Sequence, residues 1–180
     1  PDVARLDRVL HERCAGSVHD AHRARRLDFE GLVVAAILLG RLRHEPDVGH
    51  AAHGARVECA VGLAEVRAQA ATNLGFFVAQ GELEEISEET YSEVQAGLLE
   101  SARGEDATRV RRHALEALGF ASKPEVDALI GAALQHKDAD WQASALVAMG
   151  RSADERWEDQ ILLALLDEND IVRLAAVQAA

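Results

Sequence analysis

The chain has 180 residues, of which 48% are hydrophobic, and a formal net charge of −12 at pH 7, a composition that supports a buried core and excludes a disordered tail. Its longest apolar run, Leu32–Leu39, covers 8 residues, whereas a membrane-spanning helix needs about 18. The acidic balance opposes nucleic acid binding, because such binding draws its affinity from phosphate neutralisation.

Three helices are predicted before residue 63, and glycines interrupt the last of them. Apolar residues at helical spacing predict one helix over residues 3–14, a second over 27–39 and a third over 47–61. Gly49, Gly54 and Gly62 weaken the third helix. We therefore expect residues 1–63 to form irregular helical hairpins of the same stack as the segments that follow.

From residue 64 onward, one phrase of ten residues recurs. Its copies are Val66–Gly75, Val110–Gly119, Trp141–Gly150 and, cut one residue short, Val172–Ala180; they begin 44, 31 and 31 residues apart. Within each copy the apolar residues follow the stripe of an amphipathic helix. We expect the small residues Ala114 and Ala145 to lie buried between helices. We also expect each final glycine to end its helix in a left-handed conformation.

A second helix is predicted between successive phrases, over Tyr91–Leu99, Pro124–Leu134 and Trp157–Leu166. Pro124 suits a first helical turn, and the helix caps are expected at Thr108, at Asp138 or Asp140, and at Asn169 or Asp170. The first interval is 13 residues longer than the others, and the extra residues are predicted in loops around Gln80–Ser87 and Gly104–Thr108. The chain is thus predicted to be one all-α domain, regular over residues 64–180 with an insertion around residues 80–108.

These phrases, with Asp shortly before Val-Arg and Ala-Leu-Gly after it, resemble HEAT repeats, most closely the short HEAT-like type known from phycobilisome bilin lyases. The resemblance covers about residues 64–180. It implies a right-handed α-solenoid of about five helical hairpins, with the Val-Arg helices on the concave side and Arg67, Arg111 and Arg173 tying repeats together. Gln142 departs from that pattern. Such motifs specify a fold and leave the chemistry open.

We expect a scaffold or adaptor that binds a protein or peptide on the concave face, without catalysis and without a cofactor. Residues 61–180 carry 22 acidic and 10 basic side chains, which favours a basic or helical partner. The candidate binding residues lie off the buried stripe and are Arg112, His113, Glu116, Ala143, Val147 and Leu174. Two interpretations of this set stay open: an exposed strip for a docked helix, or packing within the stack with Arg112 and Glu116 paired.

The sequence also leaves two alternative classes of function open. His50 and His53 lie three residues apart, which puts both imidazoles on one face of a helix, as a metal pair requires. The first alternative is therefore an enzyme or enzyme subunit built on HEAT repeats, either similar to bilin lyases or with a metal held by histidine. The second is a HEAT-like module that binds nucleic acid, against which the acidic charge argues. Two cysteines, Cys14 and Cys59, suit a reducing cytoplasm.

The last phrase stops before its glycine position and before a second helix. We therefore expect the chain to be a piece of a longer array. An open end of such an array exposes the apolar stripe that would receive the next hairpin. Val172, Ala176 and Val177 lie in that stripe, which predicts self-association through the C-terminal end.

Overall fold

The structure is a computed structural model that describes the backbone of residues 53–180 and the side chains of residues 64–180. Its described part is all-α, with seven α-helices, one short 3-10 helix and no strand. The helices are α3 (His53–Glu82), α4 (Glu88–Arg103), α5 (Thr108–Leu118), α6 (Pro124–Leu134), α7 (Ala139–Ser152), η2 (Glu155–Trp157), α8 (Glu158–Ala164) and α9 (Asp170–Ala179). None of the helices in this part of the chain is both long and apolar enough to cross a membrane.

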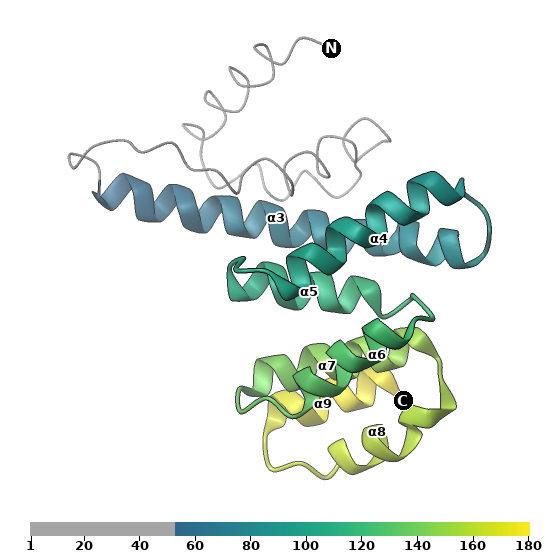
Figure 1. Cartoon of the computed structure of the whole chain (residues 1–180). Coiled ribbons are helices and arrows are strands. Elements are labelled where there is room, and N and C mark those ends of the chain that lie inside the picture. The colour runs from purple at the N-terminus through teal and green to yellow at the C-terminus, as the bar shows by residue number, and fades with distance from the viewer. Residues whose placement is uncertain (1–52) are drawn as a thin grey trace.

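The four phrases lie in α3, α5, α7 and α9, which we call the repeat helices. α3 packs against α5, α5 against α7 and α7 against α9, so that the repeat helices follow one another in chain order (Figure 1). The other helices, α4, α6 and α8, are the companion helices, and each packs against the repeat helix that follows it in the chain. The fold is therefore a stack of helical hairpins.

Polar side chains cap the starts of three of the described α-helices, and a proline opens a fourth. Ser87, Asp138 and Asn169 cap α4, α7 and α9 by accepting a hydrogen bond from a backbone amide of the first turn, and Pro124 opens α6. The expected cap at Thr108 is wrong. Thr108 is the first residue of α5, and Ala107 precedes it without a side-chain hydrogen bond.

The left-handed conformation predicted for the phrase glycines is also wrong, although Gly119 does end α5. No glycine in the described residues has a positive φ angle, Gly75 and Gly150 lie inside α3 and α7, and Gly119 has right-handed helical angles. Each glycine instead faces the next repeat helix. A Cβ atom added to Gly119 would lie 2.6 Å from the backbone of Ala148, and one added to Gly150 would lie 2.7 Å from Ala179. The glycines are there because neighbouring helix backbones approach closely.

The core lies between the repeat helices and their companions. Ala114 and Ala145 are fully buried, as predicted from the phrase, beside Leu115 and Leu146. The longer first interval is accommodated largely by helix rather than loop, because α3 continues past Gly75 to Glu82 and α4 has 16 residues, whereas α6 has 11. Their connection is short and covers residues 83–87.

Tyr91 fixes the turn between α3 and α4. A Cβ atom on Gly81 would lie 1.9 Å from the Tyr91 ring, so the ring rests directly on the α3 backbone. The Tyr91 hydroxyl donates to Glu82 at the end of α3 and accepts from Gln95 at 3.0 Å. Burial, with the Glu82 carboxylate adding to it, raises the pKa of Tyr91 above its ordinary value, so the phenol stays a hydrogen-bond donor.

Candidate functional site

The second residue of each phrase ties its helix to a neighbouring segment. Arg111 donates from Nε to the carbonyl of Ala102 at the end of α4, at 3.3 Å, and Arg173 donates to the carbonyls of Asp167 and Glu168 after α8 at 2.8 and 2.9 Å. Gln142 departs from the pattern in residue type, yet it donates to the His136 carbonyl at 3.0 Å. It thereby makes the same kind of contact with a shorter, neutral side chain.

Arg67 makes its contact with the following hairpin. Its Nη2 lies 2.5 Å from Oδ1 of Asp106, in the loop between α4 and α5, and the two side chains are only 10% and 6% exposed. A buried guanidinium needs such a carboxylate, because desolvation of an uncompensated charge is costly. This ion pair therefore joins α3 to the start of the second repeat.

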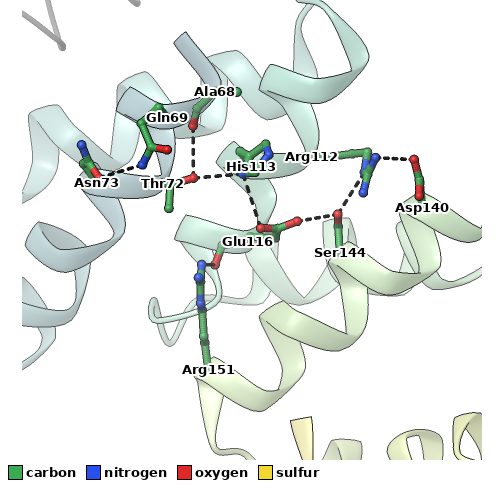
Figure 2. A network of polar contacts seen from close by, with 10 residues as sticks. All are labelled: Ala68, Gln69, Thr72, Asn73, Arg112, His113, Glu116, Asp140, Ser144 and Arg151. Atoms are coloured by element: carbon green, nitrogen blue, oxygen red, sulfur yellow. Dashed lines mark hydrogen bonds and ion pairs between the residues drawn. The ribbon is translucent and has the colours of Figure 1, made fainter. Parts of the chain in front are cut away.

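A chain of polar contacts, which we call the polar ladder, crosses three repeat helices (Figure 2). Thr72 Oγ1 of α3 lies 2.9 Å from His113 Nδ1 of α5, and Ser144 Oγ of α7 donates to Glu116 of α5 at 2.6 Å. Arg112 then reaches from α5 to Ser144 at 3.1 Å. It also pairs with Asp140 of α7 at 2.7 Å. The residues of the ladder are Thr72, Arg112, His113, Glu116, Asp140 and Ser144.

The ladder follows a rule that recurs between repeats. The seventh residue of one phrase meets the fourth residue of the next, as Thr72 meets His113 and Glu116 meets Ser144. Spacing within a single helix could not show this rule, because it relates two helices. An alignment of the phrases shows that Ser144 stands at the same position as His113, but it does not show which residue of the neighbouring helix Ser144 contacts.

His113 is held between α3 and α5 in its neutral form. Thr72 Oγ1 lies 3.1 Å from the Ala68 carbonyl, to which it donates, so it accepts from His113 if Nδ1 carries the proton. Burial lowers the pKa of His113 below its ordinary value, and the positive charges of Arg109 and Arg112 add to this. The carboxylates of Glu116, 3.6 Å away, and Glu65 act in the opposite sense without reversing the direction.

Arg151 of α7 contacts the carboxyl end of α5, next to the polar ladder. Its Nη1 donates to the Glu116 carbonyl at 2.6 Å, and its guanidinium lies 5.2 Å from the centre of the Phe120 ring. A cation at the carboxyl end of a helix is favourable because it complements the helix dipole. Burial lowers the pKa of Arg151, although the group stays charged at neutral pH.

Serine, histidine and glutamate meet in this ladder, but not in the order that nucleophilic catalysis needs. The Ser144 hydroxyl donates to Glu116, and His113 lies on the far side of that carboxylate. A nucleophilic serine instead needs the imidazole as its immediate base. Ser144 is also only 1% exposed, so a substrate has no access to it. The arrangement holds helices together.

The six candidate binding residues divide into two groups in the structure. Arg112, His113 and Glu116 are half-buried and belong to the polar ladder, and the contacts of Arg112 run to α7. Ala143 and Val147 are half-buried on α7, and Leu174 on α9 is 61% exposed. The first three thus lie on α5 with contacts to α3 and α7, and the apolar three lie toward the end of the stack.

The metal alternative falls largely outside the described residues. His50 lies outside them, and His53 is the first residue of α3, without a described side chain. In the part of the chain whose side chains are described, no group of three or more His, Cys, Asp and Glu residues is arranged to hold a metal ion. A metal held by His50 and His53 therefore stays an alternative that the described residues do not test.

Comparison with known proteins identifies the repeats. Residues 95–180 match the family model for HEAT repeats. No curated protein and no solved structure gives a significant match to the chain. The sequence-based prediction of HEAT repeats is confirmed for this stretch, and the narrower resemblance to the phycobilisome lyase type stays a prediction.

Proposed function

We propose that this HEAT-repeat chain is a protein-interaction scaffold that holds a segment of another protein against its repeat helices. HEAT repeats imply a general role in protein interaction. In our proposal the hairpins form a right-handed solenoid, the repeat helices line its concave side, and binding occurs without catalysis or a cofactor. The enzyme and nucleic acid alternatives have less support, because the polar side chains of the ladder are engaged with one another.

The observation that supports this site is a change in the junctions between repeats. The junction between α5 and α7 is polar, with Glu116 against Ser144. At the next junction the same phrase positions hold Val147 and Ala175. Leu174 lies beside Ala175 in the sequence and is 61% exposed. A partner would therefore find its apolar contacts on α7 and α9, on Ala143, Val147 and Leu174.

Charge supports a basic partner. Nine of the ten Lys and Arg residues between 64 and 180 contact a carboxylate, a carbonyl, a side-chain amide or an aromatic ring of the described structure. Several carboxylates have no basic partner in that part of the chain: Glu84, Glu89, Glu93, Glu105, Glu155, Glu158 and Asp159. A segment with an apolar stripe and basic flanks would complement this surface, and its association would slow with added salt.

Selection of peptides from a random displayed library tests this proposal. We expect the immobilised chain to select amphipathic, basic peptides, and a synthetic copy to bind less tightly to the Leu174→Glu variant. Leu83→Glu is the matched control, because Leu83 is also exposed but lies between α3 and α4. Peptides that bind the Leu174→Glu variant as tightly as the wild type would place the site elsewhere and contradict the proposal.

A further inference from the structure

A pocket of about 180 Å³ opens between α4, α5, α6 and α7, separate from the polar ladder. Leu115 and Ala102 form its buried part, and Leu129, Ala132 and Ala133 of α6 form one wall. Arg111, His136 and Trp141 complete the lining. The pocket is therefore apolar inside and carries nitrogen donors at its edge.

The two donors are held in place by other contacts. Arg111 donates from Nε to the Ala102 carbonyl, and its guanidinium lies 5.2 Å from the centre of the Trp141 ring. His136 Nδ1 accepts from the Asp138 amide at 3.0 Å, which leaves the proton on Nε2. The Nη atoms of Arg111 have no hydrogen-bond partner among the described residues. Preorganised donors of this kind reduce the entropy lost on binding.

The following repeat shows that this pocket is not a general property of the hairpin. One period of 31 residues later, Leu163 stands where Ala132 stands here, and Gln142 replaces Arg111. Asp167 and Val172 take the places of His136 and Trp141. The aromatic wall and the positive edge thus occur together in one repeat and are both absent from the equivalent positions of the next, where the larger Leu163 takes the place of Ala132.

The charge at the pocket edge is opposite to that of the molecule as a whole. Lys137 follows His136 directly, and it makes no ion pair with the described residues. Arg111 is thus the one charged side chain that lines the pocket, and Lys137 and Asp138 follow His136 in the chain. Arg binds a carboxylate through two parallel hydrogen bonds when its Nη atoms are available.

We propose that this pocket binds a leucine-like side chain of a partner peptide whose neighbouring carboxylate is held by Arg111 and His136. The site goes beyond the function proposed above, because it uses α4–α7 and an acidic group rather than α7 and α9 and a basic one. Failure of the peptide-selection experiment at Leu174 would leave it unaffected.

The test uses two synthetic dipeptides, N-acetyl-Leu-Glu-amide and its neutral counterpart N-acetyl-Leu-Gln-amide, added to the isotope-labelled chain. The reporter is the indole N–H signal of Trp141 in NMR spectra, and Trp157, the second of the chain's two tryptophans, is an internal reference. We expect saturable shifts of the Trp141 signal with a dissociation constant on the order of a millimolar for the acidic peptide. The neutral peptide should bind about tenfold more weakly, because it lacks the charged hydrogen bonds.

Two variants copy the next repeat and therefore keep side chains that the fold accommodates there. Ala132→Leu fills the pocket and should abolish the Trp141 shift, whereas Ala128→Leu, on an exposed position of α6 outside the pocket, should leave it unchanged. Arg111→Gln should reduce binding of the acidic peptide to the level of the neutral one. Equal binding of the two peptides, no saturable shift, or full binding by Ala132→Leu would each overturn the proposal.

Discussion

Alanine at position 119 or 150 would place a methyl group against the backbone of the next repeat helix. The added Cβ atom would lie 2.6 Å from Ala148 or 2.7 Å from Ala179, distances at which a backbone has to move. Gly97 and Gly131 face open space instead, with no atom within 4 Å of an added Cβ. Glycine-to-alanine substitutions should therefore destabilise the fold at positions 119 and 150 but not at positions 97 and 131.

We predict that Gly119→Ala and Gly150→Ala each lower the free energy of unfolding by about 1–3 kcal/mol, the usual cost of overpacking. Gly131→Ala in α6 should raise it by about 0.5–1 kcal/mol, because alanine loses less backbone entropy than glycine in a helix. Urea denaturation followed by circular dichroism measures both effects. Equal stability of Gly119→Ala and Gly131→Ala would contradict the close contact.

The neutral His113 predicts a pH dependence of stability. Its pKa in the folded chain lies below the ordinary value of 6.5, so the unfolded chain takes up the proton first as the pH falls. The stabilisation that the neutral His113 ring gives to the folded chain is therefore complete above about pH 6.5. It is lost as the pH falls through the pKa of His113 in the folded chain. We expect the unfolding free energy of His113→Gln to fall less between pH 7 and pH 5 than that of the wild type.

NMR titration of the His113 ring gives an independent measurement. The midpoint should lie below 6.5, because burial and the charges of Arg109 and Arg112 oppose protonation more than Glu116 and Glu65 favour it. A midpoint at or above 6.5 would show that Glu116 dominates. The pH dependence predicted for stability would then have the opposite sign.

At the scale of the elements, the ion pair between Arg67 and Asp106 joins the first repeat helix to the second hairpin. Asp106→Ala would leave the Arg67 guanidinium buried without this carboxylate, and we expect a loss of about 3–5 kcal/mol of stability. Glu125→Ala is the matched control, because its pair with Arg103 is solvent-exposed and worth about 1 kcal/mol or less. Similar thermal stability of the two variants would refute a buried role for Asp106.

The sequence predicted the elements better than it predicted their contacts. Periodicity placed the repeat helices and the burial of Ala114 and Ala145, because one apolar stripe is a local property of a helix. Periodicity did not explain why the phrase ends in glycine, because the reason is the close approach of Gly119 to the backbone of Ala148 on another helix. Likewise the partners of Arg112 and His113 lie on α7 and α3. Contacts of this kind depend on how far one helix is shifted along the next.

The candidate site was predictable only in part for the same reason. Ala143, Val147 and Leu174 lie off the buried stripe as the spacing indicates, but their different exposures depend on which helix comes next. The pocket beside Trp141 has no sequence signal within one repeat. It emerges only when Ala132 is compared with Leu163 one period later.

At the scale of the whole molecule, the face of α9 carries apolar side chains that are covered elsewhere in the stack. Val177 is 64% exposed, whereas the same phrase position is buried at Ala71, Leu115 and Leu146. Leu162, Leu163 and Leu166 on or just after α8 are exposed as well. Large apolar side chains exposed on α8 and α9 favour association.

We predict that the apparent mass of the 180-residue chain rises above 19.4 kDa with protein concentration in light scattering. Val177→Glu should suppress this rise, because it places a charge in the apolar face, and Leu83→Glu should not. A mass that stays at 19.4 kDa over the whole concentration range would show that this face does not mediate self-association.

The contacts between glycine and alanine also determine where the chain can accept inserted residues. Gly119 and Ala148 are 29 residues apart, as are Gly150 and Ala179, whereas Gly75 and Ala117 are 42 apart. The extra residues of the first unit lie before Val110. The alanine and glycine of the phrase that begins at Val110 therefore keep their register with the neighbouring repeat helices. We therefore expect insertions between a glycine and the following phrase to be tolerated, whereas an insertion within a phrase would shift its alanine and glycine out of register with the neighbouring helices. Lengthening of this molecule should proceed through companion helices and their turns, while the phrases keep a fixed length.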